Sequence, residues 1–235
     1  MEPLHLTLVT YNIHHAAGMD RRVDLERIAG VIRDTGAHIA CLQEVDCHVV
    51  RSRRANQPRE LGRMLGMTPL YHPTLRWPMG QRYGNLLLTS LPITASETHA
   101  LPGRGEPRGL IEAHLETDAG PIAVFCTHWG LPEPDRVVQA CRTAEILQTV
   151  PVPLLFAGDL NEGPEGPDHQ TLREIGLCSL GPSGGTFPAP EPVATIDHVY
   201  GSAEWRVREA YTVPSLASDH RPVVVDLSLH PAPAG

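Results

Sequence analysis

Carboxylate, carboxamide and imidazole side chains stand at the ends of six short apolar segments in this sequence. They are Asn12 after LTLVTY, Glu44 after IACLQ, His128 after IAVFCT, Asp159 after LLFAG, Asp197 and His198 after ATI, and Asp219 and His220 before PVVVDL. A rigid scaffold places its binding and catalytic groups on the loops at strand ends. Each residue alone has an ordinary explanation as a turn, capping or core residue. Six such coincidences in one chain point to a shared site.

Metal ligands and a proton acceptor are both present in this set. Hard oxygen atoms, of the type that binds Mg²⁺ or Mn²⁺, are supplied by Glu44, Asp159, Asp219, Asn12 and Asn161. A histidine accepts a proton near neutral pH, and Asp197 is the candidate that would set the tautomer of such an imidazole. These residue types suit attack of water on a phosphoester, with the charge neutralised by metal and imidazolium.

The elements that would position these residues are short strands interrupted by a few helices. Strands are expected over residues 4–11, 38–45, 83–90 and 92–100, in a hairpin over 111–129, and in four later segments that end near Leu229. Helices are expected around 25–35, 59–65, 135–149 and 170–175, with Asp135 as an N-cap. About ten strands and four helices, with hairpins among strand–helix–strand units, favour two packed sheets with outer helices over one parallel Rossmann sheet.

Length and composition fit one domain over residues 1–235. Hydrophobic residues make up 41% and charged residues 20% of the chain, which is ordinary globular usage. No apolar run approaches the roughly 18 residues of a membrane span, and the first residues lack the features of a secretory signal. We therefore expect a cytoplasmic protein. Cys41 and Cys126 lie in apolar runs, and the five cysteines include no CxxC, so reduced core residues are expected.

Charge argues against a broad surface for nucleic acid, without excluding such binding. The net charge is -8, and the densest basic stretch holds only Arg51, Arg53 and Arg54. The 13 histidines keep a zinc hydrolase open as an alternative, although no HxH or HExxH spacing occurs. His14 and His15, as neighbours on a strand, would point to opposite faces.

The motifs and their order resemble the endonuclease/exonuclease/phosphatase superfamily of metal-dependent phosphoesterases. In chain order they are TYNIHH (10–15), LQEVD with Glu44, YGNLLLTS with Asn85, THWGL with His128, GDLNEGP with Asp159 and Asn161, TIDHVY with Asp197, and SDHRPV with Asp219 and His220. The resemblance covers nearly the whole chain. It implies an α/β fold, a four-layer α/β/β/α sandwich of two packed mixed sheets with outer helices, and a site at one edge of the sheets.

By matching position, the resemblance also implies a role for each residue of the set. Glu44 would be the principal ligand of Mg²⁺ or Mn²⁺, with Asn12 and Asp219 completing or orienting that site. His220 would be the general base, oriented by Asp197. The remaining catalytic residues would be Asp159 and Asn161, which position the nucleophile and the scissile phosphate, and His128, which stabilises developing charge or aids the leaving group. Arg108, just before the strand at Ile111, and Asn85 are candidate substrate-binding residues.

Three functions follow from these observations. The first is a metal-dependent phosphoesterase that acts on a small-molecule or lipid-head-group phosphodiester, since the chain is acidic and lacks a long basic insertion. The second is a DNA or RNA endo- or exonuclease with the same site. The third, from another class, is a non-catalytic binding module on a phosphoesterase fold. Substrate specificity is expected in loops 51–58, 72–81 and 163–192, and the oligomeric state is not predicted.

Overall fold

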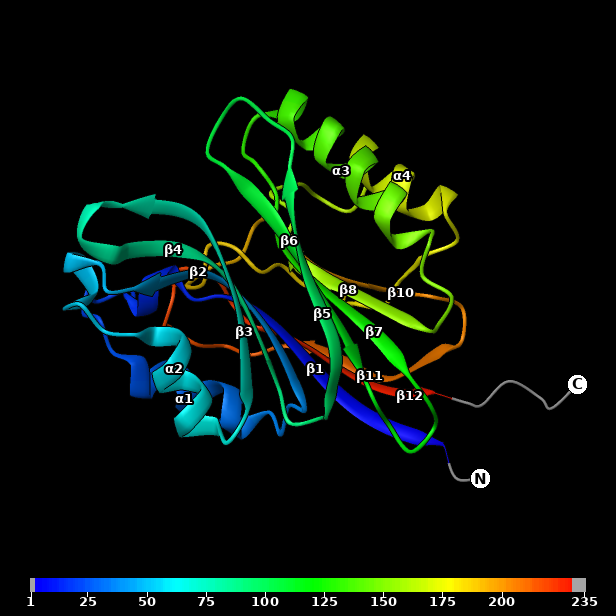
Figure 1. Cartoon of the computed structure of the whole chain (residues 1–235), viewed down its shortest axis with the longest axis horizontal. Helices are drawn as coiled ribbons and strands as arrows, with labels where there is room; N and C mark the ends of the chain where they lie inside the picture. The colour runs from blue at the N-terminus through cyan, green and yellow to red at the C-terminus, as the bar shows by residue number, and fades with distance from the viewer. Residues whose placement is uncertain (1–2, 230–235) are drawn as a thin grey trace, which may run out of the picture.

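Two six-stranded mixed sheets pack face to face in the computed structural model, which describes residues 3–229 (Figure 1). The first sheet has the order β11 (Trp205–Thr212), β12 (Val223–Leu229), β1 (Leu4–Asn12), β2 (Ile39–Cys47), β4 (Gln81–Thr89) and β3 (Thr68–Trp77). The second has the order β5 (Ile93–Leu101), β6 (Arg108–Leu115), β7 (Ile122–His128), β8 (Leu154–Asp159), β10 (Asp197–Gly201) and β9 (Cys178–Ser179). Each sheet contains one parallel pair of strands, β1 with β2 and β7 with β8.

Helices cover the outer faces of both sheets. They are α1 (Leu25–Asp34), α2 (Gln57–Leu65), α3 (Glu133–Leu147) and α4 (Pro167–Glu174). Figure 1 shows α1 and α2 on the outer side of the first sheet, and α3 and α4 on the opposite side of the molecule, over the second. The predicted four-layer α/β/β/α sandwich is thereby confirmed. Across residues 3–229, no helix is both long and apolar enough to cross a bilayer.

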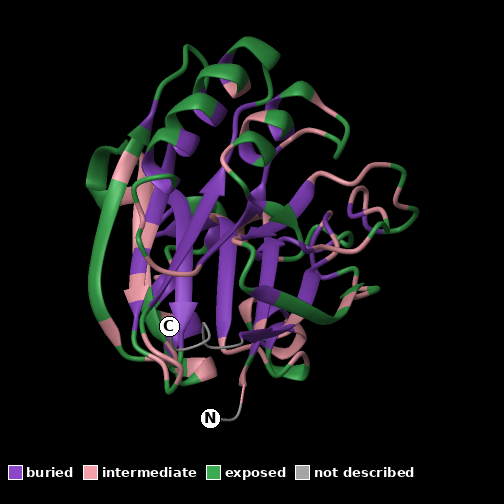
Figure 2. Ribbon diagram, turned by 90° about the vertical axis from the view of Figure 1, so that its right-hand side faces the viewer, coloured by how far each residue is buried: buried purple, intermediate pink, exposed green. Residues whose placement is uncertain are grey.

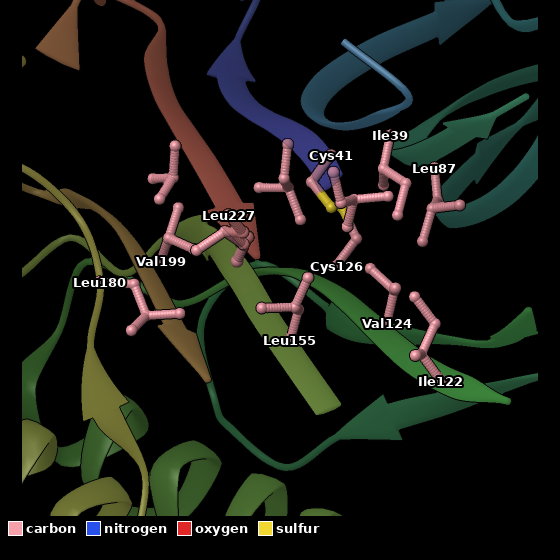
Figure 3. Packing of buried hydrophobic residues seen from close by; sticks show 14 of the residues in the cluster. Ile39, Cys41, Leu87, Ile122, Val124, Cys126, Leu155, Leu180, Val199 and Leu227 are labelled. Atoms are coloured by element: carbon pink, nitrogen blue, oxygen red, sulfur yellow. The ribbon is translucent and has the colours of Figure 1, made fainter. Parts of the chain in front are cut away.

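Apolar side chains fill all three spaces between these four layers. The central layer joins the facing sides of the two sheets, and Figure 3 shows Leu155, Val124 and Leu227 within it. Cys41 and Cys126 lie side by side there, fully buried and free, which confirms them as core residues. Cys141 and Cys178 are exposed, so the expectation of a core position was wrong for these two. Figure 2 shows the result: the strands at the centre are mostly buried, and the helices expose their outer faces. Burial at about 25 cal/mol per Å² of apolar surface makes these layers the main stabilising contribution.

Residues 72–81, expected as a loop, belong mainly to a β-hairpin. β3 runs from Thr68 to Trp77 and pairs antiparallel with β4. Pro69 and Pro73 make this segment a poor strand candidate, because proline has no N–H to donate to a ladder. β3 lies at the edge of the first sheet, where such residues are tolerated. The expectation of a loop was therefore wrong.

Asp135 was expected to cap the third helix, but it does not. The helix begins at Glu133, and its N-cap position is Pro132. The Asp135 carboxylate instead accepts the backbone N–H groups of Arg104 and Gly105, at 2.9 and 2.8 Å. Asp135 therefore ties the helix to the loop between β5 and β6.

Candidate active site

Three of the predicted residues lie side by side across the second sheet. In the strand register His128 pairs with Asp159, and Asp159 pairs with Asp197. His128 and Asp159 end the parallel strands β7 and β8, while Asp197 begins the antiparallel strand β10. Sheet pairing therefore brings an imidazole and two carboxylates to one edge, and all three residues are buried.

In the first sheet a β-bulge directs Glu44 toward this edge. The pairing of β2 with β4 shifts register between Leu42 and Val45, and Glu44 has a φ of 60°. Leu42 and Val45 consequently both pack into the layer under α1 and α2, although they are three residues apart. A bulge re-aims the side chains around it, and a left-handed non-glycine residue carries a conformational cost. The residue that has this unfavourable backbone conformation, Glu44, is the one predicted to bind the metal.

Asp159 joins the two sheets at the centre of the site. Its Oδ2 atom lies 3.0 Å from Asn12 Nδ2, 3.5 Å from His128 Nε2 and 3.8 Å from His220 Nε2. Its Oδ1 atom accepts the backbone N–H of Asn161 at 3.0 Å, in an Asx turn. One carboxylate oxygen therefore holds the turn after β8, and the other faces the groups that gather from both sheets.

Asn12 orients two carboxylates at once. Its Nδ2 donates to Glu44 Oε1 at 3.1 Å as well as to Asp159, and its Oδ1 accepts the backbone N–H of His14 at 3.0 Å. Because the amide oxygen accepts a backbone N–H, the amide nitrogen is the part of Asn12 that contacts these two carboxylates.

His220 and Asp197 form a buried pair. His220 Nδ1 lies 2.9 Å from Asp197 Oδ2, and the ring of Phe187 packs 4.8 Å from the imidazole centre. Burial alone would lower the pKa of His220, but the charge of Asp197 and its hydrogen bond outweigh burial and raise this pKa to about 10. The geometry matches an imidazole held in one orientation by a carboxylate, with Nε2 left to face Asp159.

His128 is held in the opposite protonation state. Burial, followed by the charges of Arg108 and His220, keeps the pKa of His128 well below its usual range. Arg108 donates from NH1 to His128 Nδ1 at 2.9 Å, so the single proton of the neutral ring is on Nε2, which faces Asp159. His128 is therefore a neutral hydrogen-bond donor. Arg108, also paired with Glu106 at 2.9 Å, is the one predicted substrate-binding residue that lies against the central group.

Other predicted residues lie around this central group. Asp219 lies next to it, 3.6 Å from His14 Nδ1. Asn161 donates from Nδ2 to the Trp129 carbonyl at 2.8 Å, which joins the loops after β7 and β8. Asn85 is buried and donates to the Gly109 carbonyl at 2.9 Å, beside Arg108. His198 bonds to the Glu162 carbonyl at 2.9 Å and packs against His169 in the layer under α4, so it lies outside the group.

The position expected for His14 and His15 was wrong. They do not continue β1 but form a tight turn after it, His14–Ala16, with left-handed backbone at both histidines. One ligand atom from each of His14, His15 and Glu44 lies within 4.8 Å of the others. The alternation of a strand did not predict that the two histidines lie together near Glu44, because β1 ends at Asn12. Their position directly after Asn12 in the NIHH segment was the signal that could have placed them at the site.

The donor atoms of the site fit a divalent cation. Carboxylate oxygens of Asp159 and Asp197 lie with a nitrogen of His220 in a buried group whose atoms are within 4.8 Å of one another. Asp197 Oδ1 is buried and has no hydrogen-bond partner among residues 3–229. Glu44 and Asp219 add carboxylates at the more exposed side. So many acidic oxygens in a small volume repel one another, and a divalent cation relieves that repulsion.

The pKa of Asp159 predicts how metal-free protein responds to pH. Burial, with the charge of Asp197, raises this pKa from its ordinary value of 3.8 to about 7. A carboxyl group with a raised folded-state pKa contributes stability below its unfolded pKa and loses it as the pH rises through the folded value. In EDTA, Asp159→Asn is therefore expected to raise the melting temperature relative to wild type more at pH 8 than at pH 5, by a few degrees, at about 2–4 °C per kcal/mol.

The exposed turn residue Asp118 supplies a matched control. Asp118→Asn removes one carboxylate between β6 and β7, away from the site, and its effect on melting should not depend on pH in this way. Differential scanning calorimetry of the three proteins at both pH values makes the comparison. A loss of stability in Asp159→Asn that grows with pH would contradict the prediction.

The fold and this edge site define a class, the two-sheet α/β/β/α sandwiches with carboxylates and histidines gathered at one end of the sheets. The chain belongs to the Endonuclease/Exonuclease/phosphatase family, whose model matches residues 9–220. Members of this family are phosphoester hydrolases. The match includes every residue of the site described above.

Relatives and solved structures agree with this assignment. The chain is 27% identical to the protein YbhP of Escherichia coli K12, over 94% of this chain and 96% of YbhP. An endonuclease/exonuclease/phosphatase from Beutenbergia cavernae superposes with a TM-score of 0.82 and 25% identity, covering 98% of this chain and 73% of that one. The mannosyl-6-phosphatase Bt3783 of Bacteroides thetaiotaomicron has a TM-score of 0.75 and 20% identity, covering 94% and 99%.

Proposed function

We propose that this protein is a divalent-metal-dependent phosphodiesterase that uses Mg²⁺ or Mn²⁺ and acts on a small-molecule or lipid-head-group phosphodiester. The observation that carries the proposal is the position of Asp159. Its Oδ2 lies within 3.8 Å of Asn12, His128 and His220, which come from both sheets. A single point thereby combines a carboxylate, a proton acceptor and a neutral hydrogen-bond donor, the groups that hydrolysis of a phosphoester needs.

Glu44, Asp219 and Asp159 would hold the metal, with Asn12 orienting two of these carboxylates. A divalent cation bound there would neutralise charge on the phosphoryl oxygens. His220 accepts the proton of the attacking water at Nε2, and Asp197 holds Nδ1 and stabilises the resulting imidazolium. His128 donates its Nε2 proton in a hydrogen bond, toward a phosphoryl or leaving oxygen. The bond that forms joins the water oxygen to phosphorus, and the bond that breaks is the ester P–O bond. The leaving oxygen then takes the proton that His220 accepted, directly or through solvent, and departs as an alcohol.

In the metal-free chain the pKa of about 10 keeps His220 protonated at neutral pH. A base must be unprotonated when water arrives. The positive charge of a cation near Asp159 would oppose this protonation, so metal binding and base activity are expected to go together.

The surroundings of the site favour a small substrate. With a net charge of -8, the chain has no broad basic surface to hold a polynucleotide. Arg51 pairs with Asp46, two residues after Glu44, and lines a surface cavity of about 500 Å³ with Val49, Trp77, Pro78 and Gln81. Because Asp46 neutralises Arg51, the exposed ring of Trp77 is the feature of this cavity that suits the cationic part of a single head group. A similar fold serves a phosphatase of a small sugar phosphate, Bt3783, which supports the proposal by analogy only.

The test compares small and polymeric substrates under the same conditions. Purified protein is assayed with bis(4-nitrophenyl) phosphate, 4-nitrophenyl phosphate, glycerophosphodiesters and supercoiled plasmid, each with Mg²⁺, Mn²⁺ or EDTA. We expect metal-dependent hydrolysis of the small diesters, with slower hydrolysis of the monoester and little plasmid nicking. His220→Ala protein assayed in parallel excludes a contaminating hydrolase.

Each other outcome has a defined meaning. Metal-dependent nicking that is lost in His220→Ala and falls steeply with salt would make the protein a nuclease. Hydrolysis of the monoester alone would make it a phosphatase. A protein that bound the metal but hydrolysed none of these substrates would contradict the proposal and favour a binding module.

A further inference from the structure

The turn His14–Ala16 holds two histidines in an unfavourable backbone conformation. The φ angles of His14, His15 and Ala16 are 44°, 46° and 66°. Left-handed backbone is unfavourable for an L-residue, and it is usually adopted by single residues, not by three in succession. Such conformations persist only where the surrounding structure imposes them.

Hydrogen bonds from several elements impose this turn. The side chain of Gln57, at the start of α2, donates to the His15 carbonyl at 2.8 Å. The His14 backbone N–H bonds to Asn12 Oδ1, and the Asp24 N–H bonds to the Ala16 carbonyl at 2.9 Å. The turn is therefore specified by residues from β1, α2 and the start of α1, and its two imidazoles have defined positions.

Both imidazoles lie at the carboxylates predicted to bind the metal. One ligand atom each from His14, His15 and Glu44 falls within 4.8 Å of the others, and His14 Nδ1 is 3.6 Å from Asp219 Oδ1. His15 Nδ1 is buried without a hydrogen-bond partner in the part of the chain that the structure describes. A buried polar atom without a partner is costly and calls for an explanation. Coordination of a metal ion would satisfy it.

We propose that His14 and His15 supply nitrogen ligands to the cation held at Glu44, so that this site selects a transition metal such as Mn²⁺ over Mg²⁺. The inference rests on the proposed function for the presence of the cation and adds its identity. Mg²⁺ prefers oxygen ligands and retains its water molecules, whereas imidazole nitrogen suits first-row transition metals. A site of oxygens alone would leave Mg²⁺, the more abundant ion, as the natural occupant. Two imidazoles change that preference.

The test measures Mn²⁺ directly, without substrate. Electron paramagnetic resonance counts free Mn²⁺ in a titration of metal-free protein, with Mg²⁺ as the competitor, and pulsed measurements detect nitrogen bound to Mn²⁺. We expect wild-type protein to bind Mn²⁺ at least about tenfold more tightly than Mg²⁺ and to show nitrogen modulation. In His14→Gln/His15→Gln the modulation should disappear, and the Mn²⁺ affinity should fall about tenfold while the Mg²⁺ affinity stays within about threefold.

His48 provides a matched control. It also has left-handed backbone, with a φ of 62°, and its Nδ1 lies 3.2 Å from the Arg54 carbonyl, outside the metal-binding group. His48→Gln should behave as wild type. Nitrogen modulation should persist in His220→Ala and in His99→Gln, which remove the histidines of the two other groups in the described residues that could hold a metal ion.

Two results would overturn the inference and leave the phosphodiesterase proposal standing. They are Mn²⁺ bound to wild type without nitrogen modulation, and a double variant with unchanged modulation and unchanged preference for Mn²⁺. The first needs no variant, so it decides the matter even if the double variant does not fold. A third result would separate the two proposals in the other direction. If Mn²⁺ were bound through nitrogen but no substrate in the panel were hydrolysed, the proposed function would be contradicted and this inference would stand.

Discussion

Replacing His220 with alanine is expected to lower kcat for a phosphodiester by about 10²–10⁴-fold, the usual contribution of general acid–base catalysis. The imidazole is the proton acceptor in the proposed reaction, and its Nδ1 is already held by Asp197 at 2.9 Å. Steady-state kinetics with saturating Mn²⁺ measures the loss. Added imidazole should restore part of the activity, because the substitution leaves a space beside Asp197 that the free base can enter.

His198→Gln is the matched control for this substitution. His198 follows Asp197 on β10 and is also buried, but it bonds to the Glu162 carbonyl, and glutamine can keep that bond. Its activity should stay close to that of wild type. Turnover within a few-fold of wild type in His220→Ala, in protein whose thermal unfolding shows it to be folded, would remove His220 from the mechanism.

Replacing Glu44 with glutamine is expected to raise the Mg²⁺ or Mn²⁺ concentration for half-maximal activity by about tenfold to a hundredfold. The substitution removes one anionic ligand. It keeps an oxygen that can accept the hydrogen bond from Asn12 Nδ2, which is 3.1 Å long in the wild-type protein. Because the bulge in β2 is retained, the fold should be unaffected. Activity as a function of metal concentration and direct titration of metal binding give two independent readings.

Glu116→Gln controls for the loss of one negative charge. Glu116 is an exposed residue just after β6, and it belongs to none of the His, Cys, Asp and Glu groups in the described residues that could hold a metal ion. Its metal titration should match that of wild type. An identical titration curve for Glu44→Gln would show that Glu44 has a role other than binding the cation.

Local patterns predicted the parts of this fold in which neighbours along the chain determine the structure. The alternation of Ile111, Ala113 and Leu115 predicted a hairpin, and β6 and β7 form it with these residues facing the central layer. Apolar segments followed by a polar residue predicted the edge where Asn12 and Asp159 meet. The contact between these two residues, 147 positions apart, required the packing of two sheets, which the motif order implied but no local pattern could measure.

The misses have physical causes of the same kind. The strand β3 was not predicted because its sequence contains two prolines. A strand tolerates proline when it lies at the edge of a sheet, and the sequence alone does not show that position. Glu44 was predicted as a ligand, but the bulge that aims it depends on pairing with β4. His14 and His15 were given the alternation of a strand, whereas hydrogen bonds from Gln57 and Asn12 hold them in a turn. Each of these conformations depends at least in part on residues distant in sequence, such as Gln57 for the turn at His15.

The position of β12 beside β1 has a consequence for synthesis of the protein on the ribosome. Leu4 pairs with Leu229, and Asp219 and His220 lie just ahead of the strand that makes this pairing. While the nascent chain grows, β1 can pair with β2 but keeps one side open, because its other neighbour, β12, is made only after residue 222. An open strand edge invites wrong partners. We therefore expect this edge of β1 to be a place where the unfinished chain can mispair, and Asp219 and His220 to join the site after its other residues have been made.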